Sequence, residues 1–170
     1  MAKKKPSKAK GSVAKKKAEV GKSYIAIPQL RKAFVVADNF TVGDDSMFSY
    51  VDDDVADFCG CSVKPRPGYK LVSCTLAEEM GDTDARATVP GACATDLAAI
   101  HHLISLQPRG GRIGTLSVQE EEVNVFILLG GRAEVAWQRG QGWGIWVFKG
   151  RLPSHTKWPK GTKVFGRVRG

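Results

Sequence analysis

Three runs of alternating apolar residues, separated by glycines, lie between residues 112 and 150. The runs are Glu122–Leu129, Arg132–Gln138 and Trp143–Lys149. Gly130-Gly131 separates the first two runs, and such a link predicts a β-hairpin because glycine adopts the positive φ of a tight turn without steric cost. The segment 139–142, Arg-Gly-Gln-Gly, predicts a second hairpin. The sequence therefore predicts a meander of three strands on which the rest of the fold is built.

The predicted pairing assigns the side chains of these strands to two faces. If Leu129 pairs with Arg132, and Arg139 pairs with Gly142, one face carries apolar residues from all three strands, because side chains alternate along a strand. Aromatic cross-strand pairs stabilise a sheet, so we predict a core face here. Its members are Phe126, Leu128, Val135, Trp137, Trp146 and Phe148.

The opposite face of the meander is also apolar, broken only by Arg132, Glu134 and Gln138. A sheet that is apolar on both faces is covered on both sides. The second cover is either the N-terminal half of the chain itself or another subunit. The candidate oligomer interface on this face consists of Val123, Val125, Ile127, Leu129, Trp143, Ile145 and Val147.

Basic residues gather at the two ends of the chain. Residues 1–22 hold nine lysines and one glutamate, a net charge of +8, and residues 149–170 hold seven basic residues and no acid, a net charge of +7. The segment between them holds ten basic and sixteen acidic residues, a net charge of −6, and 8 − 6 + 7 gives the overall +9. An acidic body with two basic ends indicates a polyanionic partner, most often nucleic acid, either RNA or DNA.

The first 22 residues are rich in lysine, alanine and serine and contain no aromatic residue. They hold too little apolar surface to offset the entropy lost on ordering, so we expect a disordered basic arm. We expect its lysines to neutralise phosphates, while a nuclear-localisation signal and a solubilising tail are the alternatives. The candidate nucleic-acid contacts in the arm are Lys3, Lys4, Lys5, Lys8, Lys10, Lys15, Lys16, Lys17 and Lys22.

The stretch Arg151–Gly170 alternates cations with Trp158 and Phe165. Bases stack on aromatic rings while cations hold the phosphate backbone, so this composition suits a nucleic-acid surface. The alternative is a last strand with an outward basic face and a tryptophan that packs inside the protein. The candidate contacts in this stretch are Arg151, Lys157, Trp158, Lys160, Lys163, Arg167 and Arg169.

An acidic block extends from Asp38 to Asp57 and contains seven aspartates without a basic residue. Clustered carboxylates suit Ca²⁺ or Mg²⁺, but the spacing matches no EF-hand loop, and a solvated acidic loop is the favoured interpretation. A third hypothesis is that the block docks the basic C-terminal stretch of a neighbouring subunit.

Four cysteines and the pair His101-His102 are the remaining candidates for metal binding or catalysis. The spacing of Cys59 and Cys61 is not that of a zinc knuckle, so buried free thiols are favoured over a zinc site. Adjacent residues on a helix point about 100° apart, so the two histidines do not chelate one metal together. We predict no catalytic residue, no metal site, no cofactor, no signal peptide and no membrane span.

The expected fold is mainly β. We predict a single sandwich- or barrel-like antiparallel domain over residues 23–170, with the arm at 1–22. One short helix is expected at about 93–106, where apolar residues recur at helical spacing and Thr95 or Asp96 can cap the first turn.

This layout, a lysine-rich arm on a compact β body that self-associates, resembles that of small capsid-type proteins and indicates no particular family. It implies a non-enzymatic structural protein whose arm binds nucleic acid, in a virion or an intracellular nucleoprotein particle. The first alternative is a ribosomal, chromatin or other ribonucleoprotein component. The second is a metal-dependent enzyme that acts on nucleic acid through the acidic block.

Overall fold

The computed structural model describes residues 21–60, 62–89, 92–111, 114–120, 122–151, 153 and 155–168. Its strands are β1 (Lys22–Ile27), β2 (Phe34–Val35), β3 (Phe48–Val51), β4 (Ser62–Val63), β5 (Tyr69–Thr75), β6 (Met80–Gly81), β7 (Ala92–Cys93), β8 (Asn124–Leu128), β9 (Gly131–Gln138), β10 (Gly142–Lys149), β11 (Lys157–Trp158) and β12 (Lys163–Val168). Its helices are α1 (Val36–Asn39), α2 (Asp54–Cys59), α3 (Asp82–Ala87) and α4 (Leu97–Ser105).

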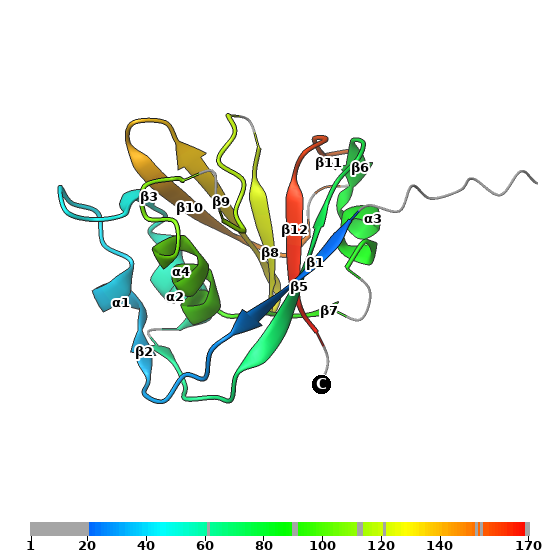
Figure 1. Cartoon of the computed structure of the whole chain (residues 1–170). Coiled ribbons are helices and arrows are strands. Elements are labelled where there is room, and N and C mark those ends of the chain that lie inside the picture. The colour runs from blue at the N-terminus through cyan, green and yellow to red at the C-terminus, as the bar shows by residue number, and fades with distance from the viewer. Residues whose placement is uncertain are drawn as a thin grey trace, which may run out of the picture.

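One eight-stranded sheet dominates the structure, and the prediction of a mainly-β protein is confirmed. Its strand order is β1-β5-β12-β8-β9-β10-β3, with β7 pairing with β12, and β6–β11 and β2–β4 form two small sheets (Figure 1). The pairs β12–β8 and β10–β3 are parallel, so the predicted purely antiparallel sheet is wrong and the sheet is mixed. A sandwich or barrel is not confirmed, because in the described residues the sheet runs open from β1 to β3.

The first predicted hairpin forms, with its turn one residue earlier than expected. Leu128 pairs with Gly131, so the two-residue turn is Leu129-Gly130, and Gly130 has a φ of 78°. Glycine therefore supplies the positive φ at the second turn position. The pairing moves by two residues along β9, which leaves the predicted faces of β8 and β9 unchanged because two is the side-chain period.

The second hairpin also forms, but its loop is one residue longer than predicted. Gln138 pairs with Gly142, which leaves a three-residue loop whose Gly140 has a φ of 75°. A shift of one residue moves every side chain of a strand to the opposite face. Consequently Trp146 and Phe148 lie outside the predicted core face, and three residues predicted for the other face replace them: Trp143, Ile145 and Val147.

The helix predicted at about 93–106 forms as α4, but it begins only at Leu97, and Cys93 belongs to β7. The Asp96 carboxylate caps α4 by accepting a hydrogen bond from the Ala99 N–H at 2.9 Å. The prediction of a single helix is wrong, because α1, α2 and α3 also form. Each has only four to six residues, too short to show helical periodicity. α1 and α2 overlap the two ends of the acidic block and β3 lies inside it, so the block is not one continuous loop.

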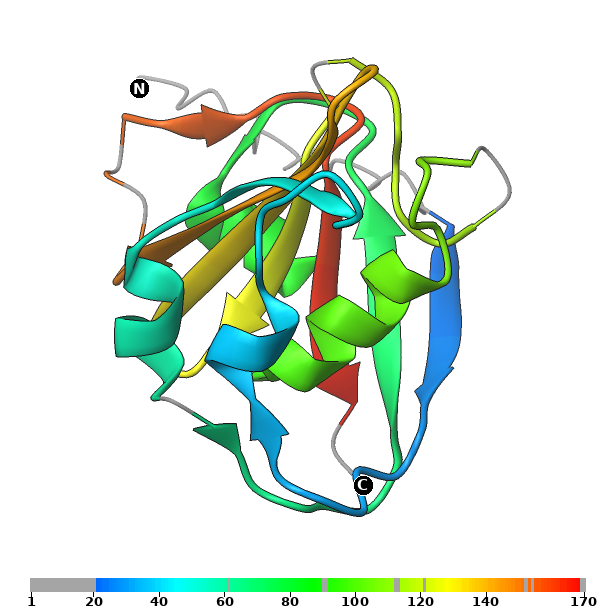
Figure 2. The ribbon, with the colours of Figure 1, turned by 90° about the vertical axis from the view of Figure 1, so that its left-hand side faces the viewer.

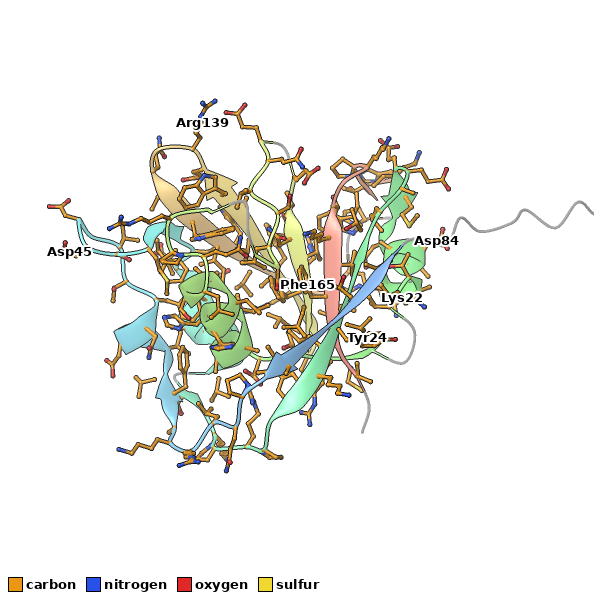
Figure 3. The ribbon with its side chains drawn as sticks, in the orientation of Figure 1. Lys22, Tyr24, Asp45, Asp84, Arg139 and Phe165 are labelled. Atoms are coloured by element: carbon orange, nitrogen blue, oxygen red, sulfur yellow. The ribbon has the colours of Figure 1, made fainter. Side chains whose placement is uncertain are left out.

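The main core lies between one face of the sheet and α1, α2 and α4 (Figure 2). Leu97, Ile100 and Leu103 of α4 are at most 1% exposed. On the sheet side, the rings of Phe126 and Phe165 stack with centroids 4.5 Å apart, and Figure 3 shows Phe165 at the centre of the molecule. The Trp143 indole N–H donates to the Gln107 carbonyl at 2.7 Å, which ties β10 to the end of α4. Burial of this apolar surface is the main stabilising contribution to the fold.

A second cluster covers part of the opposite face of the sheet. Val164 of β12 points into it while its neighbour Phe165 points into the main core, as alternation along a strand requires. Ala85 of α3, Trp158 of β11 and the half-buried Met80 of β6 form the cover over β5, β12 and β8. The second apolar face is therefore covered by the chain itself over β5, β12 and β8. The cover ends at β9, where the Arg86 guanidinium of α3 donates to the Gly131 carbonyl at 3.4 Å.

Candidate functional site

The lysines of the predicted arm fall almost entirely outside the described residues. Lys22 is the exception: it is the first residue of β1 and is exposed on the edge strand of the sheet (Figure 3). β1 has Pro28 directly after it, as expected of an edge strand. The candidate contacts outside the described residues are Lys3, Lys4, Lys5, Lys8, Lys10, Lys15, Lys16, Lys17 and Arg169.

Trp158 is part of the protein interior. It is 5% exposed, belongs to the second cluster, and its indole N–H donates to the Asp82 carboxylate at 3.3 Å. Phe165, the other aromatic residue of the C-terminal stretch, is fully buried. The basic C-terminal stretch therefore offers neither ring for base stacking. Both aromatic side chains pack inside the protein, as the alternative interpretation expected of the tryptophan.

Two cations of the C-terminal stretch also have internal roles. The Lys163 ammonium donates to the Thr115 carbonyl at 2.9 Å. The Arg167 guanidinium lies 4.5 Å from the centroid of the Tyr69 ring, and that of Arg66 lies 4.4 Å from the same ring. Burial raises the pKa of Tyr69 to about 12, and its hydroxyl donates to the Asp96 carboxylate. These contacts hold β5, β12 and the start of α4 together.

Three candidate cations, Arg151, Lys157 and Lys160, remain exposed. Lys157 forms an ion pair with Glu79 at 2.9 Å, with both side chains more than half exposed. Such a surface pair stabilises a protein little, because water screens both charges. These three cations are available to a partner.

The acidic block is dispersed along the surface. Asp44 and Asp45 lie in an exposed turn before β3, and Figure 3 shows Asp45 at the tip of that turn. The Asp52 carboxylate follows β3 and accepts from the Asp54 N–H at 3.0 Å. Among the described residues, no group of three or more histidine, cysteine, aspartate or glutamate side chains is placed to hold a metal ion. The arrangement therefore gives the divalent-metal hypothesis no ligand set.

The cysteines do not come together in the part of the chain that the structure describes. Cys74 is buried in the second cluster beneath α3, and Cys93 is half-buried in β7. Cys61 lies outside the described residues, and only the backbone of Cys59 is described. The zinc hypothesis gains no support from the two described thiols.

His101 and His102 diverge, as adjacent helical residues must. The His101 ring packs among Phe34, Phe40 and Phe48, with centroids 5.3, 5.6 and 6.2 Å away. Burial lowers the pKa of both histidines, and Arg66 lowers the pKa of His102 further. Both histidines line a hollow of about 270 Å³ between α4 and the segment after β1. His101 packs against these three phenylalanine rings.

The seven residues of the predicted oligomer interface have different surroundings. Trp143, Ile145 and Val147 lie in the main core, and Val125 is buried in the second cluster. Val123 and Ile127 are half-buried against that cluster. Leu129, at the β8–β9 turn, is 88% exposed. The chain itself thus covers most of this set.

A different apolar surface is exposed on the outer side of β10 and β3. We call it the aromatic face, and its members are Tyr50, Trp146 and Phe148. The Tyr50 and Trp146 rings stack with centroids 5.2 Å apart, and Tyr50 is 43% exposed. Phe148 is 36% exposed. Between Trp146 and Phe148 lies an open hollow of about 310 Å³, whose other lining residues are Val123, Glu134 and Ala136.

A nearly buried ion pair forms the border between the aromatic face and the second cluster. The Arg132 guanidinium contacts the Glu134 carboxylate at 2.7 Å and lies 4.3 Å from the Phe148 ring centroid and 5.5 Å from that of Trp158. Arg132 is 5% exposed. The pair is neutral overall, so the floor of the hollow carries no net charge. Sequence reasoning missed the aromatic face because the one-residue difference in the β9–β10 loop reverses the direction of Trp146 and Phe148.

Comparisons with known proteins returned no match: no family model, no curated protein and no solved structure is similar to this chain. Across the described residues, no helix is long and apolar enough to cross a membrane.

Proposed function

We propose that this chain is a non-enzymatic structural protein that self-associates through its β body and binds nucleic acid through its lysine-rich N-terminal segment, as capsid-type proteins do. Its place is a virion or an intracellular nucleoprotein particle. The two ends of the chain are basic, and the β body exposes an aromatic surface. This combination suits packing between subunits better than it suits catalysis.

The observation that carries this proposal is the segregation of charge along the chain. The eight lysines among residues 1–20 precede β1, whereas residues 23–148 carry a net charge of −6. Phosphates attract clustered lysines, and the acidic body repels the same polyanion. Binding is therefore directed to the N-terminal segment, and the body remains available for contacts between protein subunits.

The C-terminal stretch supports a smaller share of binding. Of its seven candidate contacts, Trp158 is buried and Lys163 and Arg167 have partners inside the protein. Among the six candidates that the structure describes, Arg151, Lys157 and Lys160 are the exposed ones. These cations reinforce binding by the arm, and they lack an exposed aromatic neighbour within their own stretch on which a base could stack.

The salt dependence of binding tests the proposal. Fluorescence anisotropy with a labelled single-stranded oligonucleotide is measured for the full chain and for a chain whose lysines in residues 1–20 are all glutamine, which keeps the length. If all eight lysines are engaged, the plot of log K against log salt for the full chain reaches a slope of about −6. The glutamine chain should lose most of this slope. Equal slopes would overturn the role of the arm.

A further inference from the structure

Two segments that are far apart in the sequence form one antiparallel ribbon at the edge of the sheet. Residues 22–35, which contain β1 and β2, pair with residues 62–75, which contain β4 and β5. Between these two ladders, the backbones of Leu30 and Arg66 exchange two hydrogen bonds of 2.9 Å. Both ribbon views show the segments side by side (Figures 1 and 2). We call this pair of segments the basic ribbon.

The ribbon is basic although the body as a whole is acidic. Its two segments contain six lysine and arginine residues and no acidic residue, whereas residues 23–148 together carry a net charge of −6. Arg66 is held by the Asp96 carboxylate at 2.6 Å. The other five are exposed, and none of them forms an ion pair with another described residue. They are Lys22, Arg31, Lys32, Lys64 and Lys70.

The neighbouring segments add acidic residues at the two ends of the ribbon. Asp38 of α1 follows β2, and Asp57 of α2 precedes β4. At the other end, Glu78 follows β5, and Asp84 of α3 lies toward the start of β1 (Figure 3). Between these ends, the carboxylate that packs against the ribbon is that of Asp96, which Arg66 already neutralises. The middle of the ribbon therefore favours a polyanion.

Tyr24 stands on the outer face of the ribbon between two lysines. It is 66% exposed, the most exposed aromatic side chain in the described residues. Side chains alternate along β1, so Lys22 and Tyr24 share the face opposite to that of the buried Ile27. Lys70 pairs with Ala26 and therefore points to the same face, diagonal to Tyr24. Lys22 and Lys70 each lie about 7–8 Å from Tyr24 along or across the strands.

We propose that a single-stranded nucleic acid lies along the basic ribbon, with a base stacked on Tyr24 and phosphates held by Lys22 and Lys70. This inference rests on the nucleic-acid binding in the proposed function, to which it adds a second contact surface and a class of substrate. An exposed ring flanked by cations holds a single strand without regard to its sequence. The bases of a duplex are stacked on one another, so the ring selects an unpaired strand.

The ribbon adds to binding by the arm and does not replace it. The lysine-rich residues 1–20 directly precede β1 in the sequence, so one nucleic-acid strand can contact both. Tyr50, the other exposed tyrosine, differs in its surroundings, because Asp52, Asp53 and Asp54 follow its strand. These acids repel phosphates, so Tyr50 provides a matched comparison for Tyr24.

Fluorescence anisotropy of the full chain with a labelled single-stranded oligonucleotide tests the stacking contact. Tyr24→Ala should weaken binding by roughly 5-fold or more. Tyr24→Phe keeps the ring and should bind as the parent chain does. The control Tyr50→Ala should also leave the affinity unchanged, and circular dichroism verifies that each variant is folded. A loss of equal size in Tyr24→Ala and Tyr50→Ala would overturn the assignment to the ribbon.

The salt dependence of the same binding tests the phosphate contact. Lys70→Gln removes one cation, so the plot of log K against log salt should lose about 0.7 of its slope. Tyr24→Ala should keep the parent slope, because a ring releases no counterion. Lys149→Gln is the control, since Lys149 is an exposed lysine at the end of β10 and lies outside the ribbon. The same change of slope in both lysine variants would count against a phosphate site at Lys70.

Four further outcomes separate this inference from its alternatives. If Tyr24→Ala weakens binding to a duplex as much as binding to a single strand, base stacking is ruled out. If Tyr24→Ala prevents self-association in ultracentrifugation but leaves oligonucleotide affinity unchanged, another protein chain occupies the ribbon and the inference fails. If Tyr24→Ala binds as the parent does while the arm-dependent slope persists, the inference fails and the arm proposal stands. If the chain with glutamines in residues 1–20 keeps the full slope while Tyr24→Ala weakens binding, the arm proposal fails and the ribbon stands.

Discussion

The Trp146 indole occupies the space above Gly144, where a Cβ would stand 2.3 Å from the ring. Gly144 is not held in a left-handed conformation, so glycine is required here by the close approach of the ring alone. The same strand that buries Trp143 on its inner side therefore presents a flat aromatic residue on its outer side. This relationship makes the aromatic face sensitive to a single methyl group.

Gly144→Ala should displace the Trp146 indole and break its stack with Tyr50. We expect the free energy of unfolding to fall by about 1–3 kcal/mol, the usual cost of overpacking. The control is Gly43→Ala, because no atom lies within 4 Å of a Cβ at Gly43. Urea unfolding and near-ultraviolet circular dichroism measure both variants, and equal behaviour of the two would contradict the packing described for Trp146.

The Arg132–Glu134 ion pair should contribute more to the free energy of unfolding than the exposed Lys157–Glu79 pair. Glu134→Gln leaves the Arg132 charge nearly buried without its partner, so we expect a loss of about 3 kcal/mol in the free energy of unfolding. Glu79→Gln, which removes the partner of the exposed Lys157, should cause no measurable change. Chemical denaturation measures both variants, and a loss of similar size in the two would contradict the burial of Arg132.

Acid should destabilise the packing around His101. Because burial lowers the pKa of His101 below its ordinary 6.5, the unfolded chain binds a proton more readily than the folded chain. The stabilising contribution is therefore present above pH 6.5 and is lost as the pH falls from there through the lower folded-state pKa. Replacement of the imidazole in His101→Phe keeps an aromatic ring and should flatten stability against pH in this window. Unfolding midpoints of the parent chain and of His101→Phe between pH 7 and 5 provide the comparison, and parallel profiles would contradict the burial of His101.

Trp158 should matter for stability and not for nucleic-acid binding. Trp158→Phe removes the indole N–H that bonds to the Asp82 carboxylate, and we expect a loss of about 1–2 kcal/mol in the free energy of unfolding. Oligonucleotide affinity should not change, because the ring is 5% exposed. Lys160→Ala should show the reverse pattern, with unchanged stability and weaker binding. Weaker binding by Trp158→Phe at full stability would restore the stacking hypothesis for this residue.

Local signals in the sequence were sufficient for some elements of the fold. Apolar spacing and the capping carboxylate of Asp96 predicted α4, and Pro28 predicted that β1 is an edge strand. Glycines marked both hairpins of the meander. These features depend on the chemistry of a few neighbouring residues, which sequence patterns report well.

Other features depend on differences that a pattern does not determine. One extra residue in the β9–β10 loop exchanged Trp146 and Phe148 with Trp143 and Ile145, because side chains alternate along a strand. The short helices α1, α2 and α3 arise from tertiary packing of Val36, Val55 and Ala85 and not from periodicity. The aromatic face could be found only once the register of β10 was known.

Light scattering coupled to size-exclusion chromatography tests the central claim most directly. The full chain and a chain that begins at residue 21 are measured with and without nucleic acid, at two salt concentrations. The account predicts that both chains self-associate, and that only the full chain takes up nucleic acid at low salt and releases it at high salt. Two monomeric chains, or equal uptake of nucleic acid by the chain without residues 1–20, would contradict it.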